Sequence, residues 1–348
     1  MKKALICGIS GQDGAYLAQL LLDKGYEVFG TSRDAQMTSF RNLERLGIAD
    51  RIMLKSMSLN DFRSVLQVIS KIEPDEIYNL AGQTSVGLSF ELPVETMESI
   101  SIGTLNLLEV IRFLGAPIRF YNAGSTECFG DTGDTVATET TAFHPRSPYA
   151  CAKAAAHWQV ANYREAYNLY ACSGILSNHE SPLRPKRFVT QKIVSAAVAI
   201  ARGEQTGLRL GNISIQRDWG WAPDYVEAMY RMLQQDQPED FVIATGYTAS
   251  LEDFVAAVFA HVGLDWREHV QADASLLRPS DIAISRNSPQ KAKEKLGWAA
   301  QYLMPEVARK MVDALLNPAL LPASGGQSAN GSTPKESQPS SLGAGRPT

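Results

Sequence analysis

A glycine-rich turn near the start of the chain, Gly8-Ile9-Ser10-Gly11-Gln12-Asp13-Gly14, limits the possible folds most sharply. It follows an apolar run at residues 4–7 and leads into leucines at helical spacing over residues 14–24. In such a strand–turn–helix unit, Gly8 allows the tight turn, Gly11 lets the backbone approach a pyrophosphate, and Gly14 permits close helix–strand packing. Amide groups at the helix start then face the phosphates. The spacing predicts a dinucleotide-binding unit; a plain glycine-rich turn is the alternative.

Strand-like apolar runs alternate with helical patterns over the first two-thirds of the chain. This alternation predicts a parallel, doubly wound α/β sheet of the Rossmann type, because parallel neighbours need helical crossovers. The expected strands lie at residues 4–7, 26–29, 52–54, 76–80 and 118–122, and the expected helices at 14–24, 61–72 and 99–113.

From about residue 175 the alternation loosens and prolines interrupt longer connections. We expect a Rossmann domain over residues 1–175, with later returns to it, and a smaller C-terminal α/β substrate lobe over 176–316. Helices at 189–202, 225–235 and 251–262 would frame that lobe, with Trp219 and Trp221 packed inside it. Residues 321–348 are mostly Ser, Gly, Pro, Ala and Gln, so we expect a disordered low-complexity tail.

Composition excludes several classes of protein. The chain has 348 residues, 45% of them hydrophobic, and a net charge of −4, so no basic excess favours nucleic acid. No apolar run is long enough to span a bilayer, and no cleavage motif follows the N-terminal apolar run, so we expect a cytoplasmic protein. Cys7, Cys128, Cys151 and Cys172 have no metal spacing, so we expect reduced thiols and no metal site.

Tyr149 and Lys153 lie in the stretch Ser147-Pro148-Tyr149-Ala150-Cys151-Ala152-Lys153. Four residues apart on a helix, the two side chains share one face. A nearby ammonium favours the phenolate, so we expect the tyrosine pKa to fall toward the range of a general base. Y-x-x-x-K is weak evidence alone, but downstream of a dinucleotide-binding unit it indicates hydride chemistry.

Candidate site residues also follow the expected strands, whose carboxyl ends face the ligand crevice of such sheets. Arg33 follows the second strand and favours NADP through a 2′-phosphate contact, although the adjacent Asp34 would repel that phosphate. A solvated loop arginine is the alternative. Leu80 and Ala81 end the fourth strand, where a nicotinamide ribose could pass. Ser125 and Glu127 follow the fifth and suit hydrogen-bonding and acid/base roles.

Several ordered runs extend these motifs along the chain: Pro145-Arg146-Ser147-Pro148-Tyr149, Asn162-Tyr163-Arg164-Glu165-Ala166-Tyr167, Asn178-His179-Glu180-Ser181-Pro182, Leu210-Gly211-Asn212 and Arg217-Asp218-Trp219-Gly220. With them, residues 1 to about 312 resemble the extended short-chain dehydrogenase/reductase superfamily, and within it the GDP-mannose 4,6-dehydratase family. The resemblance implies a lyase in nucleotide-sugar and deoxysugar metabolism, on the GDP-fucose or GDP-rhamnose route. It also implies that the smaller lobe binds a nucleotide sugar.

The resemblance implies an internal redox dehydration of GDP-mannose to GDP-4-keto-6-deoxymannose. Tyr149, held by Lys153, would take the proton from the sugar 4-hydroxyl while C4 gives hydride to NADP. Glu127 would remove the C5 proton and help expel the 6-hydroxyl as water, and hydride would return to C6. Ser125 stands where the family has a threonine that contacts the 4-hydroxyl.

The resemblance also implies two sets of ligand contacts. Cofactor contacts fall on Gly8, Gly11, Gln12, Asp13, Gly14, Arg33, Ser58, Leu59, Leu80, Ala81, Tyr149, Lys153 and His179. Substrate contacts fall on Ser85, Glu127, Asn178, Val189, Lys192, Leu210, Arg217 and Arg278.

Alternatives stay open for two of these positions. Arginines suit a diphosphate through bidentate hydrogen bonds, but Arg217 and Asp218 could simply pair at the surface. His179 could be a packed, hydrogen-bonded histidine that holds the loop before Glu180.

Some positions depart from the family pattern. Asp34 stands where a second arginine is usual, Ser58 where an adenine-contacting aspartate is usual, and Gln191 where an arginine is common. Because of these changes, the cofactor could be NAD or NADP, and the oligomer a homodimer or a homotetramer. The substrate could be GDP-mannose or another GDP-hexose or GDP-heptose. Two alternative functions also stay open. A nucleotide-sugar epimerase or 4-reductase would not need Glu127, and a non-catalytic dinucleotide sensor would not need Ser125, Glu127, Tyr149 and Lys153.

Overall fold

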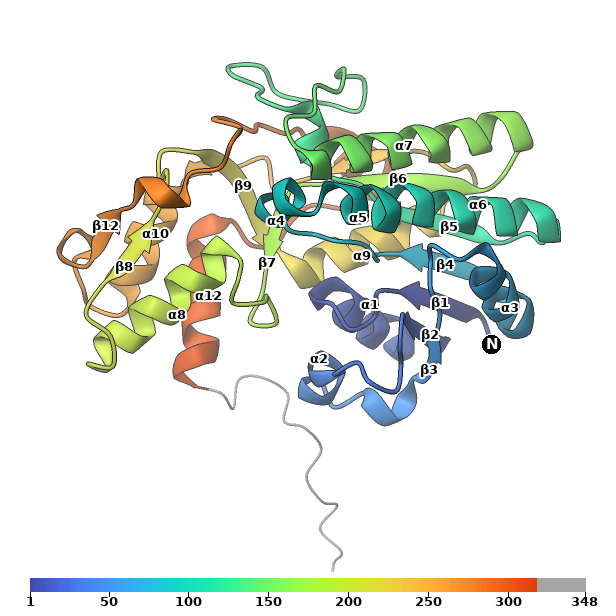
Figure 1. The fold of residues 1–348 in the computed structure, drawn as a ribbon, viewed down its shortest axis with the longest axis horizontal. Helices are drawn as coiled ribbons and strands as arrows, with labels where there is room; N and C mark the ends of the chain where they lie inside the picture. Colours follow the sequence, from blue (N-terminus) through green and yellow to red (C-terminus); the bar gives the residue numbers. More distant parts are fainter. Residues whose placement is uncertain (318–348) are drawn as a thin grey trace, which may run out of the picture.

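Seven parallel strands form the central sheet of the computed structural model, which describes residues 1–317 (Figure 1). Their order across the sheet is β10-β6-β5-β4-β1-β2-β3, so the chain winds outward in both directions from β1 and β4. The predicted doubly wound α/β architecture is confirmed. The strands are β1 (Lys3–Cys7), β2 (Glu27–Ser32), β3 (Met53–Ser56), β4 (Glu76–Asn79), β5 (Arg119–Ala123), β6 (Ala171–Leu176) and β10 (Phe241–Ile243).

Helices cover both faces of this sheet. One face packs on α1 (Gln12–Asp23) and α9 (Ala222–Leu233), with α2 (Arg41–Arg45) and α11 (Gln290–Leu296) at the margins. The other face packs on α3 (Phe62–Ile72), α6 (Gly103–Leu114) and α7 (Pro148–Tyr167). Shorter helical segments are α4 (Val86–Glu91), α5 (Pro93–Met97), η1 (Ala49–Arg51), η2 (Glu98–Ile102) and η3 (Thr126–Phe129).

The glycine turn between β1 and α1 needs its glycines for steric reasons. Gly8 has a φ of +83°, and a Cβ there would lie 2.9 Å from the Ala81 backbone on β4's exit. A Cβ on Gly14 would lie 2.6 Å from the Gly8 carbonyl oxygen and from the Ile9 Cα. Larger residues would therefore push α1 away from the sheet.

A smaller lobe sits beside the carboxyl edge of the sheet, on the left of Figure 1. Its helices are α8 (Val189–Ala201), α10 (Leu251–His261) and α12 (Met304–Leu316), which share one apolar core with buried Trp219 and half-buried Trp221. The predicted packing of both tryptophans is confirmed. Its strands and turns are β7 (Asn178–Glu180), β8 (Leu208–Leu210), β9 (Gln216–Trp221), β11 (Thr248–Ser250), β12 (Val270–Ala272), η4 (Trp266–Glu268) and η5 (Ala274–Leu276).

The expectation that the helix at 225–235 frames the smaller lobe is wrong. Tyr225, Val226 and Met229 of α9 pack with Ala15 and Ala18 of α1 in the core of the main sheet. The helical period of residues 225–235 correctly predicts a buried apolar face. It does not show whether that face packs on the main sheet or on the smaller lobe, because both offer an apolar surface. The tail predicted at 321–348 lies outside the described residues.

The four cysteines are free thiols, three buried and Cys151 exposed. Among residues 1–317, no helix combines the length and apolarity needed to cross a membrane. Within that same range, no group of His, Cys, Asp and Glu side chains could hold a metal ion.

Candidate active site

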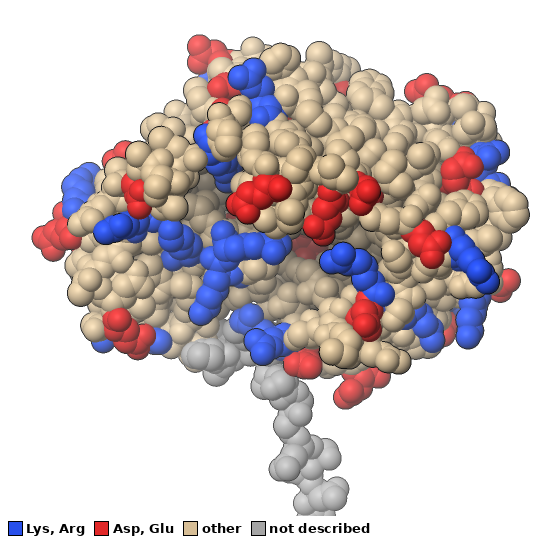
Figure 2. All heavy atoms as spheres, in the orientation of Figure 1, with Lys and Arg blue, Asp and Glu red and all other residues tan. Residues whose placement is uncertain are grey.

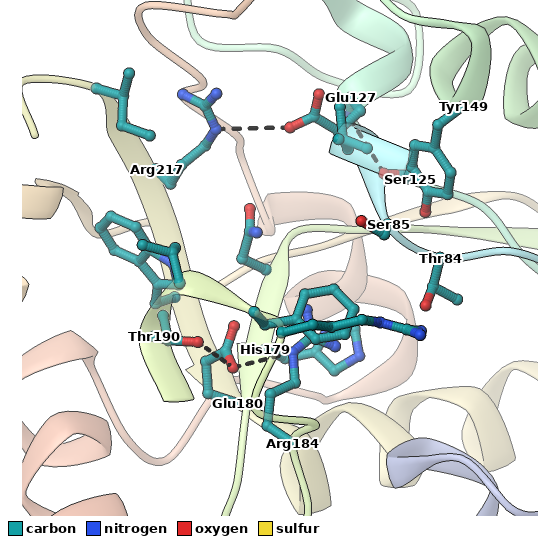
Figure 3. A pocket seen from close by; sticks show the side chains of 18 of the residues that line it. Thr84, Ser85, Ser125, Glu127, Tyr149, His179, Glu180, Arg184, Thr190 and Arg217 are labelled. Atoms are coloured by element: carbon teal, nitrogen blue, oxygen red, sulfur yellow. Dashed lines mark hydrogen bonds and ion pairs between the residues drawn. The ribbon is translucent and has the colours of Figure 1, made fainter. Parts of the chain in front are cut away.

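Four predicted catalytic side chains meet at the carboxyl end of β5. Ser125 follows the strand, and its hydroxyl accepts a hydrogen bond from the Glu127 amide at 3.3 Å, which starts the turn η3. Ser147 caps α7 by accepting from the Ala150 amide at 3.1 Å, and this fixes the start of the helix that carries Tyr149 and Lys153. All four line one cleft, which we call the central cleft (Figure 3).

Burial changes the acid–base character of the tyrosine–lysine pair. Tyr149 is 9% exposed, and burial raises its pKa well above its usual value, although the Ser125 hydroxyl opposes that shift. Burial lowers the pKa of Lys153 to about 8. The Lys153 amine lies 5.8 Å from the centre of the Tyr149 ring and donates to the Ala123 carbonyl at 2.7 Å. The expected lowering of the tyrosine pKa is wrong for this state, because desolvation outweighs the opposing effects of the Ser125 hydroxyl and the Arg184 cation.

Glu127 points across the central cleft toward Arg217 of β9 (Figure 3). The Arg217 Nε lies 3.6 Å from the Glu127 Oε1. Burial raises the pKa of Glu127, and the guanidinium groups of Arg217 and Arg278 oppose that rise. A partly buried carboxylate with a raised pKa suits an acid/base role.

Arg217 is 4% exposed, so the interpretation of a surface pair with Asp218 is wrong. Its Nη2 lies 3.1 Å from Asp281, and its Nη1 donates to the Gln216 carbonyl at 2.9 Å. Asp218 instead accepts from the Ser177 hydroxyl at 3.0 Å and from the Gly246 amide at 2.8 Å. Alternating side chains of β9 therefore point to opposite sides, so Arg217 lines the cleft and Asp218 does not.

The structure brings each predicted set of ligand contacts together. The central cleft contains every predicted substrate residue: Ser85, Glu127, Asn178, Val189, Lys192, Leu210, Arg217 and Arg278. It also contains His179. An adjoining cleft, here called the glycine-turn cleft, contains Gly8, Gly11, Gln12, Asp13, Gly14, Arg33, Ser58, Leu59, Leu80 and Ala81.

The two clefts share Asp13, Leu80, Thr84, Arg184, Arg187 and Phe188, so they form one continuous hollow. Figure 2 shows Lys and Arg side chains gathered along the hollowed middle of this face. The N-cap of α1 is Gly11, whose position gives no side-chain cap, so the first amides of the helix need an acceptor from elsewhere. Such amides and a glycine turn fit a dinucleotide pyrophosphate.

His179 joins the smaller lobe to the glycine turn. Its Nε2 lies 2.9 Å from Asp13 Oδ2, its Nδ1 lies 2.7 Å from the Ser177 carbonyl oxygen, and its ring stacks on Tyr225. Burial opposes a charge on His179, but Asp13 raises its pKa overall, and the pair holds the pKa of Asp13 at about 2. Both ring nitrogens are engaged, which favours the structural interpretation.

Sequence reasoning missed several residues of the hollow. Glu180 is 1% exposed and accepts from the Thr190 hydroxyl at 2.8 Å, with Arg184 Nε at 3.2 Å (Figure 3). Arg184 lines both clefts, and its guanidinium lies over the Phe188 ring at 3.7 Å. The run of basic residues at 184–187 was the available signal. Asp281 carried no signal, because only the fold brings it to Arg217.

The parallel sheet, the glycine turn and the Tyr/Lys pair over its carboxyl edge define a member of the extended short-chain dehydrogenase/reductase class. The sequence profile described as GDP-mannose 4,6 dehydratase matches residues 5–311. GDP-mannose 4,6 dehydratase 1 of Arabidopsis thaliana is 46% identical over 322 residues, covering 90% of this chain and 89% of that protein. The human GDP-mannose 4,6 dehydratase is 41% identical over 336 residues, covering 89% and 90%. The chain therefore belongs to the GDP-mannose 4,6-dehydratase family.

Solved structures support the fold independently. The dTDP-glucose 4,6-dehydratase from Bacillus anthracis in complex with NAD aligns with a TM-score of 0.80 at 19% identity, covering 92% of this chain and 98% of that one.

Proposed function

We propose that this enzyme is a hydro-lyase that converts GDP-mannose to GDP-4-keto-6-deoxymannose and water. Membership of the GDP-mannose 4,6-dehydratase family supports this activity. The observation that carries the mechanism is the position of Glu127, which shares the central cleft with Ser125, Tyr149 and Lys153. An oxidation alone would need only the tyrosine and lysine, whereas loss of water needs a further acid/base group.

Tyr149 takes the proton of the sugar 4-hydroxyl, while Ser125 holds that hydroxyl beside it. Because burial raises the tyrosine pKa, the positive charge of Lys153 is needed to favour the phenolate. Oxidation at C4 makes the C5–H acidic. Glu127 removes the C5 proton and delivers it to the leaving 6-hydroxyl, so that water departs and a C5–C6 double bond forms. A carboxyl with a raised pKa can perform both proton transfers.

The chemistry that a nicotinamide cofactor supplies here is reversible hydride transfer, from C4 of the sugar and back to C6. Gly8, Gly11, Gln12, Asp13 and Gly14 would hold its pyrophosphate at the start of α1. Leu80 and Ala81 would contact the nicotinamide half, next to the catalytic residues. A proton added at C5, balanced by the one that Tyr149 took from the 4-hydroxyl, completes the product, and the cofactor is not consumed overall.

We further propose NADP as the preferred cofactor. The Asp34 carboxylate accepts hydrogen bonds from the amides of Gln36 and Met37 at 2.9 and 3.1 Å, so its charge is directed into its own loop. The Arg33 side chain is 84% exposed at the rim of the glycine-turn cleft, with Glu95 at 3.9 Å. An exposed guanidinium at this position suits a 2′-phosphate. The cytoplasmic location and the homo-oligomer remain predictions.

The activity is tested by incubating the purified protein with GDP-mannose and NADP. We expect the alkali-absorbing 4-keto product from the wild type. Glu127→Gln should lower product formation by about 10²–10⁴-fold, because it removes a general base. The variant should still oxidise C4, seen as reduced nicotinamide absorbance. Tyr149→Phe is the matched control that should lose both signals.

A nucleotide-sugar epimerase would give a different pattern. An epimerase that acts at C4 needs no base at C5, so Glu127→Gln would leave its turnover unchanged. That result, or the absence of product from the wild type with any GDP-hexose or GDP-heptose, would contradict the proposed dehydration.

A further inference from the structure

Two carboxylates and two guanidinium groups form a chain across the central cleft, in the order Glu127, Arg217, Asp281, Arg278 (Figure 3 shows the first pair). Asp281 Oδ1 lies 3.1 Å from Arg217 Nη2 and 3.3 Å from Arg278 Nη1. One carboxylate therefore joins the two arginines that the substrate diphosphate would need. Asp281 also accepts from the amide of Ile282 at 2.9 Å, which fixes its side chain to its own segment.

The contacts of the Arg217 guanidinium differ in quality. Its contacts to Asp281 and to the Gln216 carbonyl, at 3.1 and 2.9 Å, lie within hydrogen-bond distance. Its contact to Glu127, at 3.6 Å, is longer than the 2.7–2.9 Å typical of a charge-assisted hydrogen bond. The guanidinium is thus held on the side away from the carboxylate that acts as the base.

This spacing matters because a close guanidinium stabilises the ionised form of a carboxylate and weakens it as a base. We propose that Asp281 is a positioning residue, which anchors Arg217 beside the diphosphate site and keeps the guanidinium from closing on Glu127. The inference rests on the proposed function, because it assigns to Glu127 the C5 proton transfer. Asp281 acts through Arg217 and does not itself contact the sugar.

The charges around Glu127 support this role. The charged groups that act on its carboxyl are Arg217 from β9, and Arg278 and Asp281 from the segment after η5. The Glu127 charge in turn raises the pKa values of Tyr149 on α7 and of the neighbouring Cys128. Lys153 lines the same cleft from α7. The two arginines lower the pKa of Glu127, and Asp281 and burial raise it. Loss of the Asp281 charge leaves two cations facing one carboxylate.

The test separates elimination from oxidation in a single turnover with GDP-mannose. Oxidation at C4 produces a reduced nicotinamide absorbance, and that signal decays only after Glu127 has eliminated water. For Asp281→Asn we expect the decay to slow at least tenfold. In a plot of decay rate against pH, the acidic limb should move to lower pH. The rise of the signal should stay within about threefold of the wild type, because Tyr149 is untouched. Asp281→Glu should restore the decay rate and the position of the acidic limb to those of the wild type.

Two further variants make the test specific. Arg278→Gln removes a cation that faces Glu127, so its acidic limb should move to higher pH, opposite to Asp281→Asn. Asp273→Asn is the matched control, because Asp273 lies just before η5 and pairs with Arg209 rather than with Arg217 or Arg278. It should leave the decay unchanged. If Asp281→Asn raises KM but leaves the decay and its limb as in the wild type, Asp281 is a binding residue only and the inference is overturned.

Failure of the proposed function gives a different result. In that case the wild type shows no nicotinamide signal and no product. The coupling would then be measured without turnover, as the pH dependence of GDP-mannose affinity in the Tyr149→Phe variant. Ionised Glu127 competes with the diphosphate for Arg217, so the affinity for GDP-mannose should fall as pH rises. The pH at the midpoint of this fall should be lower when Asp281→Asn is added. Equal midpoints would overturn the inference.

Discussion

At the scale of single residues, Lys153 has the clearest pH signature. Burial lowers its pKa to about 8, and the cation exists only below that pKa. If Tyr149 depends on the cation, kcat/KM should fall as pH rises above about 8. Lys153→Arg keeps a charge at all accessible pH values, so the alkaline limb should move upward even though the overall rate falls. A pH–rate profile that is identical for both proteins would contradict this role.

The single side chain of Arg33 should determine the preference for NADP over NAD. Arg33→Ala removes the cation expected to meet a 2′-phosphate, so the Kd for NADP should rise about tenfold or more while that for NAD changes little. Arg41→Ala on α2 serves as a control for a general loss of positive charge. Equal weakening of both cofactors, measured by calorimetry, would contradict the NADP assignment.

The residue scale also shows what the sequence can predict about the site. Ser125, Glu127, Tyr149 and Lys153 were found because each follows a strand end or shares a helical period, and both signals are local. Asp281 and Arg184 were missed because their roles depend on contacts with distant β9 and both clefts. The tyrosine pKa was misjudged because burial cannot be read from the four-residue spacing alone.

At the scale of elements, β7 and α1 are joined by a small polar clamp. His179 contacts Asp13, the Gln12 amide group donates to the His179 carbonyl at 3.1 Å, and the Ser181 hydroxyl donates to Gln12 at 2.7 Å. These bonds fix the strand that carries Asn178 against the glycine turn. The clamp therefore aligns the two clefts.

The clamp should make stability depend on pH. The pKa of His179 is raised in the folded state, so its contribution is fully present below its unfolded pKa near 6.5 and is lost as pH rises through the raised value. His179→Asn should cost about 3 kcal/mol of unfolding free energy at pH 6, the cost of breaking a buried pair. The cost should shrink at pH 9. Denaturant unfolding at both values measures it, and a cost that grows with pH would contradict the ion pair.

The first five strands of the Rossmann domain were predicted well, because the apolar residues of each segment repeat with a clear strand or helix period. The expected strands at 4–7, 26–29, 52–54, 76–80 and 118–122 correspond to β1 to β5 within a few residues. None of the strands β6 to β12 was predicted, including β6 and β10 of the main sheet. Five of them, β7, β8, β10, β11 and β12, have only three residues, which carry too little pattern. Helix α9 was found but assigned to the wrong layer.

At the scale of the whole molecule, an apolar surface on α5, α6 and α7 supports the predicted homo-oligomer. Val94, Phe113 and Trp158 are 68%, 69% and 62% exposed. Helices α5 and α6 follow one another along the chain, and α7 lies beside both (Figure 1). Exposed apolar side chains on neighbouring helices suit a self-complementary contact between two copies of the chain. Trp158→Glu should halve the molar mass measured by light scattering. Tyr247→Glu, at an exposed aromatic outside these helices, should not change it.

The central claim concerns the whole reaction, in which hydride removed from C4 returns to C6 of the same sugar. The most direct measurement is conversion of GDP-mannose carrying deuterium at C4, followed by NMR or mass spectrometry of the product. We predict that the 4-keto product carries the deuterium at C6, with no net change in NADP. Deuterium retained at C4, or lost to the cofactor pool, would contradict the account.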